Sequence, residues 1–274
     1  LTKTEEFSII PCEIKLLSPC LHMLPKGKVK DTEIRYRQRY LDMICNFGIR
    51  DKFLMRSKAI TYIRNYLIQR DFVEVETPVL NMLAGGASAK PFETYHNALK
   101  MNLSLRVAPE LWLKQCIISG MDRVFEIGKN FRNEGIDQTH NPEFTAIEFY
   151  WAYADYQDLM NLTEDLLSNL VKDLTGSHKV TIHDDEGKEI VIDFTPPFKR
   201  ISMMDAVKQH LGIDSYPEDL GSEEARKFFD EQCVKNNIEC GAPRTTARLI
   251  DKIAGEFIEP GMINPTFLIE HPQI

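Results

Sequence analysis

The residues of this sequence that can support chemistry gather between Arg123 and Tyr153, in the stretch RVFEIGKNFRNEGIDQTHNPEFTAIEFYWAY. Apolar and polar residues alternate on both sides of the loop at 135–142, which predicts two strands joined by a polar connection. Side chains alternate along a strand, so each strand has one polar and one apolar face. The predicted polar face carries Glu126, Gly128, Asn130, Arg132 and Glu134 from the first strand, and Phe144, Ala146, Glu148 and Tyr150 from the second.

Three residue types on this face and its loop suit a nucleotide. Arg132 offers a planar fork of donors that matches a phosphate. His140 adds a further donor for a polyphosphate, and Phe144 is a flat surface on which a purine can stack. The alternative is a solvated antiparallel sheet, since such sheets often have one face in water. We favour a ligand site, because charged residues lie on a regular sheet face and the adjoining loop also carries residues that can bind a ligand.

The spacing of these residues resembles that of a known family. Phe131-Arg132-x-Glu134 followed by His140-x-x-x-Phe144 is similar to motif 2 of the class II aminoacyl-tRNA synthetases. The longer run FRNEGIDQTHNPEFTAIEFYWAYADY resembles the lysyl-tRNA synthetases of subclass IIb, eukaryotic cytosolic type, and the resemblance extends over essentially the whole chain. It implies an α/β class II catalytic fold, with a mostly antiparallel sheet flanked by helices.

The resemblance implies ATP-dependent activation of lysine to lysyl-adenylate and transfer to tRNA(Lys), in cytoplasmic protein synthesis. Such a step needs positioning and charge neutralisation rather than a nucleophilic side chain. Mg²⁺ would accompany the ATP polyphosphate, and we expect no metal ligands within this chain. The implied ATP-binding residues are Arg132, Asn133, Glu134, His140, Asn141 and Phe144, and the implied lysine-binding residues are Gly86, Glu110, Arg132, Glu148 and Tyr150.

The roles implied by the resemblance divide the site into three parts. Arg132, the catalytic residue, would hold the α-phosphate and the lysine carboxylate. Glu110 and the backbone of Gly86 would take the α-ammonium group. The side-chain ammonium group would meet Glu148 and Tyr150. His140 and Asn141 would lie on the polyphosphate side, and Glu134 and Phe144 would place the adenine.

The elements that must position these residues begin with an amphipathic helix at 51–70, whose stripe contains Phe53, Ile60, Ile63 and Leu67. A strand and Pro78 follow, which together resemble motif 1, at about 65–80, and imply a homodimer. Asp71 stands where the family usually has glycine, a left-handed helix terminator. Glu110 follows Pro109 at a predicted helix start.

The remaining elements are predicted from capping and periodicity. A helix at 155–175 begins at Asp155 and stops at Gly176, with a leucine stripe that includes Leu159, Leu162 and Leu166. A hairpin joins strands at 180–183 and 190–194 through a solvated acidic turn. Helices are predicted at 203–212, 222–237 and 244–258, and a strand at 266–269 is expected to return to the sheet.

The first part of the chain is expected to differ from the rest. Short β-like runs at 7–10 and 13–17 match, in the resemblance, the end of an OB-fold anticodon-binding domain over 1–25. Residues 26–274 would be the N-terminal part of the catalytic domain, with motif 2 at about 123–153. The basic run from Lys26 to Arg39 predicts a helix that starts at Asp31 or Thr32, with either a solvated face or a contact to a phosphate backbone or another subunit.

Composition limits the alternatives. A formal charge of −8 argues against nonspecific affinity for nucleic acid, and no apolar run reaches the roughly 20 residues of a membrane span. The six cysteines show no metal-binding or disulfide spacing, which favours a reducing compartment. The glycine-rich motif 3 of the family is not in the sequence, and the first residue is Leu1, so we expect a truncated chain.

Three other functions share this pattern. An aspartyl- or asparaginyl-tRNA synthetase is disfavoured because Glu110 and Glu148 would repel an acidic substrate. A lysine ligase that modifies a protein is disfavoured by the OB-like remnant. A non-catalytic interaction fragment on the same scaffold should lack Arg132, Glu134 or Glu148, and all three are present.

Overall fold

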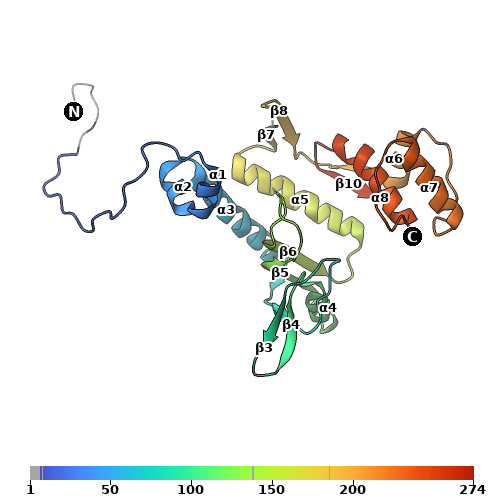
Figure 1. Ribbon diagram of the computed structural model, residues 1–274, viewed down its shortest axis with the longest axis horizontal. Helices are drawn as coiled ribbons and strands as arrows, with labels where there is room; N and C mark the ends of the chain where they lie inside the picture. Colours follow the sequence, from blue (N-terminus) through green and yellow to red (C-terminus); the bar gives the residue numbers. More distant parts are fainter. Residues whose placement is uncertain (1–6, 8, 138, 185) are drawn as a thin grey trace. The chain divides into compact units, whose positions relative to one another are not determined.

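The computed structural model describes residues 7, 9–137, 139–184 and 186–274 (Figure 1). The chain divides into two compact units, with the boundary between Ser57 and Lys58. The first unit contains α1 (Thr32–Arg37), α2 (Arg39–Cys45) and the start of α3 (Ile49–Ile68). The second contains every strand assigned in the described residues and helices α4 to α8. The domain boundary expected at residue 25 stays a prediction.

The two β-like runs near the N-terminus form no strand in the described residues, so the expectation of strands at 7–10 and 13–17 is wrong there. Their large apolar side chains are exposed, with Phe7 at 99% and Ile14 at 87%. A strand is stable only when a neighbour accepts its backbone hydrogen bonds, and no described strand lies beside these runs. The OB-fold remnant is therefore not confirmed, and residues 1–6 and 8 of the expected segment lie outside the described residues.

The arginines of the basic run are neutralised within their own helices. Asp31 caps α1, because its Oδ1 accepts the backbone N–H of Ile34 at 2.9 Å. Asp42 is fully buried in α2 and accepts from Arg35 Nε at 2.9 Å and Arg39 Nη1 at 2.7 Å. Burial raises the pKa of Asp42, but hydrogen bonds from Arg35, Asn46 and Arg39 outweigh it and hold that pKa below its usual value.

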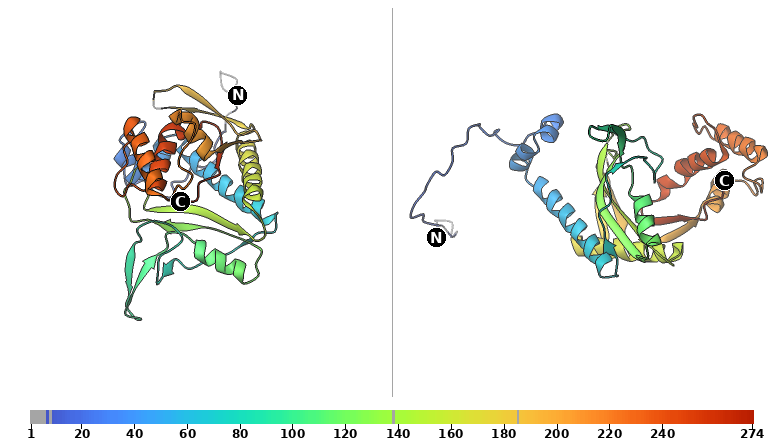
Figure 2. Two further views of the ribbon diagram at one scale, coloured as in Figure 1. Left: turned by 90° about the vertical axis from the view of Figure 1, so that its right-hand side faces the viewer. Right: turned by 90° about the horizontal axis from the view of Figure 1, so that it is seen from below.

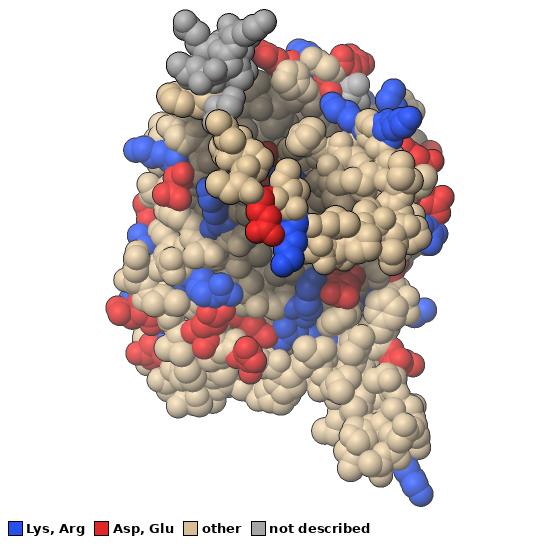
Figure 3. Space-filling view, turned by 90° about the vertical axis from the view of Figure 1, so that its left-hand side faces the viewer, with Lys and Arg blue, Asp and Glu red and all other residues tan. Residues whose placement is uncertain are grey.

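Arg37 of α1 pairs with Glu33 at 2.8 Å, so each arginine of α1 and the first arginine of α2 has a carboxylate partner. On the face shown in Figure 3, basic and acidic residues are likewise interspersed. These ion pairs favour the solvated-helix interpretation of the basic run over a phosphate-backbone contact.

Strands of the second unit form four small sheets. The central one has the order β1 (Val73–Glu74), β5 (Arg123–Phe131) and β6 (Glu143–Trp151), with β1 parallel and β6 antiparallel to β5. A second sheet has the order β2 (Leu80–Asn81), β4 (Met101–Leu105) and β3 (Glu93–His96). A hairpin joins β7 (Lys179–His183) to β8 (Glu189–Asp193). Four of the six strand pairings among the described residues are antiparallel.

The strand β10 (Thr266–Ile269) pairs in parallel with β9 (Lys199–Ser202), so the expectation that it returns to the main sheet is wrong. Parallel strands need a long crossover connection. Here α6 (Met203–Leu211), α7 (Glu223–Lys235) and α8 (Thr246–Phe257) supply it, and their own apolar core includes Phe229, Leu249 and Ile253. The crossover brings the chain back beside β9 rather than beside β6.

The apolar face of the β5–β6 hairpin packs on two helices. Phe125 is fully buried among Tyr66 and Leu67 of α3 and Leu162 and Leu166 of α5 (Tyr156–Thr175). In the first half of α3, residues 51–58 are exposed, which includes Phe53, so the predicted stripe packs only from Ile60 onward. On α5 the stripe is also incomplete at one end, since Leu159 is 37% exposed. This core holds the polar face of the hairpin outward.

Helix termini follow the predicted capping. Asp71, three residues after α3 ends at Ile68, has φ of +65°, the left-handed conformation expected for the residue that replaces glycine. Asp155 and Asp158 form a capping box at the start of α5, and Gly176 ends it with φ of +80°. None of the helices in the described part of the chain is long and apolar enough to cross a membrane.

Candidate active site

Strands β5 and β6 form a long hairpin (Figure 2). Its register brings the predicted polar residues of both strands onto one surface. Its register places Glu126 opposite Glu148, Gly128 opposite Ala146, and Asn130 opposite Phe144. A side chain at Gly128 would overlap the guanidinium of Arg106 and come within 3.1 Å of Glu126 Oε1. Gly128 and Glu126 therefore share a face, as the alternation predicts, and the glycine leaves room there for a buried arginine.

Glu148 and Tyr150 lie together on this face, toward the Trp151 end of β6. The Tyr150 hydroxyl donates to Glu148 Oε2 at 3.3 Å, and no described Lys, Arg or His nitrogen lies within 4.0 Å of the Glu148 carboxylate. Desolvation raises the pKa of Glu148, and the nearby carboxylates of Glu110 and Glu126 add to that rise. Desolvation also raises the pKa of Tyr150, so its hydroxyl stays a donor at neutral pH.

Glu148 is not the partner of a core arginine. That partner is Glu126, whose Oε1 lies 2.5 Å from Arg106 Nη1, with both side chains almost fully buried. Glu148 thus remains a half-buried carboxylate that faces a hydroxyl instead of a cation. A site of this kind suits a ligand that carries its own ammonium group.

Glu110 opens α4 (Glu110–Ile118) on the same polar face. Gly86 has φ of +88°, and a Cβ there would lie 2.9 Å from Glu110 Cβ, so the two expected contacts for the α-ammonium group are adjacent. The Glu110 carboxylate currently pairs with Lys114 Nζ at 2.6 Å, one helical turn further on. Lys114 Nζ lies 6.0 Å from the Tyr150 ring centroid, which places α4 beside the Glu148 end of the hairpin.

Arg132 follows directly after β5. Its backbone N–H donates to Pro142 O at 2.9 Å, and its guanidinium carbon lies 5.1 Å from the Phe144 ring centroid. Arg132 Nε and Asn130 Oδ1 are buried, and neither has a hydrogen-bond partner among the described residues. An unpartnered donor beside an aromatic ring is an arrangement that accepts an anion next to a flat heterocycle.

Asn133 and Glu134 are exposed and lie beyond β5, so the predicted strand is shorter than expected at its end. The backbone N–H of Asn133 donates to Lys90 O at 2.8 Å, and Glu134 Oε1 accepts the N–H of Lys90 at 3.3 Å. These contacts fix the loop to the chain that precedes β3.

Asp137 holds the rest of the loop through hydrogen bonds. The sequence pattern did not identify this residue. Its Oδ1 accepts the backbone N–H groups of Thr139 and His140, each at 2.7 Å. The hydrogen bond from Thr139 is the largest cause of a strongly lowered pKa at Asp137, which is therefore ionised. The His140 ring lies 2.9 Å from the same carboxylate and is 71% exposed. Asn141 is exposed too, and Gln138 lies outside the described residues.

Comparison with known proteins decides the family. The family model for class II tRNA synthetases (D, K and N) matches residues 31–274, which include every expected site residue. The chain belongs to this family.

Three similar proteins are named as lysine–tRNA ligases or probable lysine–tRNA ligases. The synthetase chain is 51% identical over 273 residues to lysine–tRNA ligase cla4 of Cladosporium cladosporioides, covering 98% of this chain and 46% of that protein. It is 49% identical to a probable cytoplasmic lysine–tRNA ligase of Vairimorpha ceranae, covering 100% of this chain and 54% of that protein. It is 45% identical to a lysine–tRNA ligase of Clostridium tetani, covering 99% and 53%. The chain thus spans about half the length of these curated relatives.

Two residues that the sequence did not single out, Arg106 and Lys114, contact carboxylates of the candidate site. Arg106 donates from Nη1 to Thr77 Oγ1 at 2.9 Å and from Nε to Lys129 O at 2.9 Å, in addition to its pairing with Glu126. Lys114 neutralises Glu110. The feature of the sequence that could have indicated a partner such as Arg106 is the Glu126-x-Gly128 spacing. A glycine beside a buried carboxylate leaves space for a large partner side chain. The partner itself is distant in sequence and could not be identified from the strand alone.

Two further features lie outside this site. Among the described residues no group of three or more His, Cys, Asp or Glu side chains is placed to hold a metal ion, so we derive no step through Mg²⁺.

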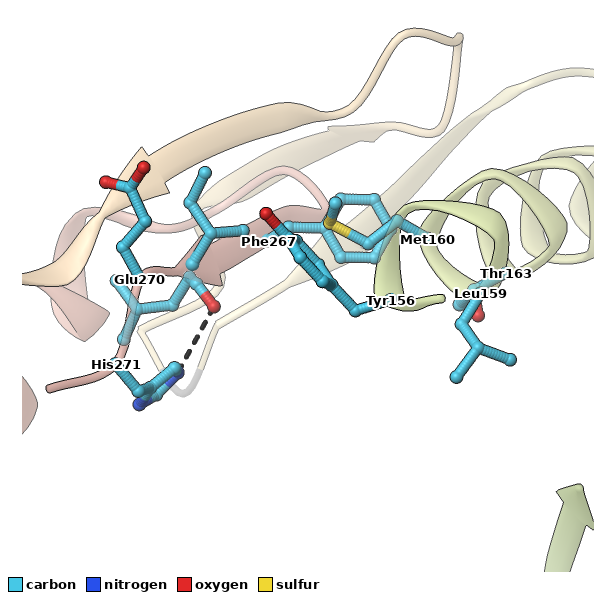
Figure 4. A pocket seen from close by; sticks show the side chains of 9 residues that line it. Tyr156, Leu159, Met160, Thr163, Phe267, Glu270 and His271 are labelled. Atoms are coloured by element: carbon cyan, nitrogen blue, oxygen red, sulfur yellow. Dashed lines mark hydrogen bonds between the residues drawn. The ribbon is translucent and has the colours of Figure 1, made fainter. Parts of the chain in front are cut away.

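An apolar cavity of about 570 Å³ lies between α5 and β10, where Tyr156, Met160 and Phe267 gather and His271 contacts Leu268 O at 3.2 Å (Figure 4). None of the expected ATP or lysine residues lines it.

Proposed function

We propose that this protein activates lysine with ATP to form lysyl-adenylate and transfers the lysyl group to tRNA(Lys). One observation carries the choice of amino acid: Glu148 is a half-buried carboxylate, and the Tyr150 hydroxyl is its only hydrogen-bond partner among the described residues. An ammonium group that leaves water needs acceptors of this kind, and a methyl or amide group would leave the carboxylate unpaired.

In the proposed reaction a lysine carboxylate oxygen attacks the α-phosphorus of ATP. The new P–O bond forms as the bond to the pyrophosphate oxygen breaks, and pyrophosphate leaves. Arg132 holds the α-phosphate and the lysine carboxylate. Its positive charge offsets the repulsion between these two negatively charged groups as they approach each other. The unpartnered Arg132 Nε supports this role, since the free donor needs an acceptor.

The other contacts of the substrates are part of the same proposal. Phe144 and Glu134 place the adenine, with Asn133 beside them, and His140 and Asn141 lie toward the polyphosphate. The α-ammonium group binds Glu110 and the backbone of Gly86, and this requires Glu110 to exchange its present partner Lys114. Mg²⁺ would neutralise the polyphosphate when bound.

The proposal extends to the molecule's setting. Residues 65–80 form the motif 1 part of a homodimer interface, 123–153 form motif 2, and the protein works in the cytoplasm. The relative from Vairimorpha ceranae is named a probable cytoplasmic lysine–tRNA ligase, which supports this location.

The test is amino-acid-dependent ATP–pyrophosphate exchange by the full-length protein, with lysine, methionine, arginine and aspartate supplied separately. We expect exchange with lysine far above that with the others. In Glu148→Gln we expect the lysine preference over methionine to fall at least tenfold, since several kcal/mol of differential binding depend on the charge. Aspartate-dependent exchange, or none with any amino acid, would refute the proposed function.

A further inference from the structure

A buried ion pair lies beside Glu148, and neither of its members is among the residues proposed to contact a substrate. Arg106 and Glu126 are 3% and 5% exposed, and their charged atoms lie 2.5 Å apart. Thr77 completes the group, because its hydroxyl donates to Glu126 Oε2 at 2.6 Å. Arg106 also donates to Thr77 O at 3.2 Å and Lys129 O at 2.9 Å. These contacts occupy Nε and Nη1 of Arg106 and both carboxylate oxygens of Glu126, so the two buried charges offset each other.

The register brings this pair next to Glu148. Glu126 and Glu148 are direct cross-strand partners on the same face, and such residues have Cβ atoms about 4.5–5.5 Å apart. Two carboxylates at this separation repel each other unless a cation lies between or beside them. Arg106 is the cation next to Glu126, and the missing side chain of Gly128 gives its guanidinium room there.

Each of the two carboxylates nearest to Glu148 has a cationic partner. Glu126 is matched by Arg106, and Glu110 on α4 is matched by Lys114. Tyr150 is neutral. Of the described carboxylates on this face at the Glu148 end, Glu148 alone has no cationic partner within 4.0 Å. Among the described residues, this end of the face thus carries one net negative charge, which one ammonium group would neutralise.

We propose that Arg106 and Glu126 are positioning residues that set the net charge of the lysine pocket and so contribute to its preference for a cationic side chain without contacting it. The inference rests on the proposed function and deepens it. The alternative role is structural only: the pair would hold the Thr77 segment and the Arg106 segment against β5 with no effect on the choice of amino acid.

A charge-only substitution separates the two roles. Glu126→Gln keeps the shape and the polar atoms of the side chain but leaves Arg106 as an uncompensated cation behind Glu148. We expect the KM for lysine in ATP–pyrophosphate exchange to rise about tenfold, and the preference for lysine over methionine in kcat/KM to fall about tenfold, since Coulomb interactions remain strong at this range in a partly buried site. The kcat at saturating lysine should change little.

The double variant Arg106→Gln with Glu126→Gln supplies the rescue. It removes both charges, restores one net negative charge, and should return the lysine preference to within about threefold of wild type. Thr77→Val is the matched control, because it removes a hydroxyl from the same group without changing any charge. We expect it to lower the thermal midpoint while the lysine preference stays unchanged.

The outcomes distinguish this inference from the proposed function. If the wild-type protein shows no lysine-dependent exchange, the proposed function fails. If the wild type activates lysine, and Glu126→Gln folds and keeps its lysine preference within twofold, the pair is structural only and the inference is wrong. A Thr77→Val variant that loses the preference as Glu126→Gln does would also overturn it. Should the double variant not fold, the comparison of Glu126→Gln with Thr77→Val still decides.

Discussion

Glu148 is held in surroundings that disfavour its charge. Burial and the neighbouring carboxylates of Glu110 and Glu126 raise its pKa, and the Tyr150 hydrogen bond and the charge of Arg106 offset this rise only in part. Functional sites often keep such groups at a cost in stability, because the ligand supplies the missing partner. On the proposed function, the substrate ammonium group would supply the cation that Glu148 lacks.

The raised pKa of Glu148 gives a pH-dependent prediction for the ligand-free protein. An acid whose folded pKa is raised contributes stability that is present below its unfolded pKa, about 4.3, and lost as the pH rises through its folded pKa. Glu148→Gln, which cannot ionise, should therefore be more stable than wild type at pH 7. Chemical denaturation at pH 7 and at pH 4 should show this gain shrinking at the lower pH.

A matched control lies on the same strand. Glu143 is 56% exposed and pairs with Lys129 at 3.1 Å, so Glu143→Gln removes a carboxylate that is not desolvated. It should give no gain in stability at pH 7. A Glu148→Gln protein that is less stable than wild type at pH 7 would contradict the account of an unfavourable charge.

Arg132 is expected to matter for chemistry far more than for stability. Arg132→Ala in the full-length protein should lower lysine-dependent ATP–pyrophosphate exchange by about 10²–10³-fold, because a donor aimed at developing charge contributes roughly 3–4 kcal/mol. Lys129→Ala, an exposed cation three residues earlier, should leave exchange within a fewfold of wild type. Exchange in Arg132→Ala within tenfold of wild type would remove Arg132 from the catalytic role.

At the scale of elements, local patterns predicted what local physics determines. The alternation along 123–131 and 143–151 identified both faces of the hairpin, because the side-chain period of a strand is fixed by its backbone. Asp31, Asp155 and Gly176 marked helix ends, because caps satisfy nearby backbone groups. Features that depend on distant partners were missed or wrong. The pairing of β10 with β9 depends on a helical crossover, and the role of Glu126 depends on Arg106.

The end of α3 offers a test of backbone strain. Asp71 adopts φ of +65°, a conformation that costs an L-residue roughly 1 kcal/mol or more relative to glycine. Its side chain contributes little in exchange, since it is 92% exposed and lies 3.8 Å from Arg123. Asp71→Gly should therefore stabilise the protein by roughly 0.5–1 kcal/mol in urea denaturation, the gain being reduced by the entropy of the unfolded glycine.

Asp51→Gly provides the control for that substitution, because Asp51 lies in the first turn of α3, where glycine costs up to about 1 kcal/mol. The two aspartate-to-glycine variants should change stability in opposite directions. A loss of stability in Asp71→Gly would show that the aspartate side chain, and not the backbone conformation, determines the helix end.

At the scale of the whole molecule, the segment after Pro78 carries apolar side chains that no described element covers. Leu80 is 47%, Met82 72% and Leu83 86% exposed, and β2 is an edge strand of its sheet. Clustered apolar exposure beside an open strand edge is typical of a surface that another chain covers. The position agrees with the motif 1 interface proposed from the resemblance, and a second copy of the same chain is the commonest partner.

We therefore predict that the full-length protein is a homodimer at micromolar concentration, measured by light scattering or sedimentation. Met82→Lys combined with Leu83→Lys should shift it toward monomer, because two buried ammonium groups oppose association across a symmetric interface. Ile118→Lys is the control: Ile118 is 83% exposed at the end of α4, away from β2 in the chain, and its substitution should leave the dimer intact. A monomeric wild type, or a double variant as dimeric as the control, would place the interface elsewhere.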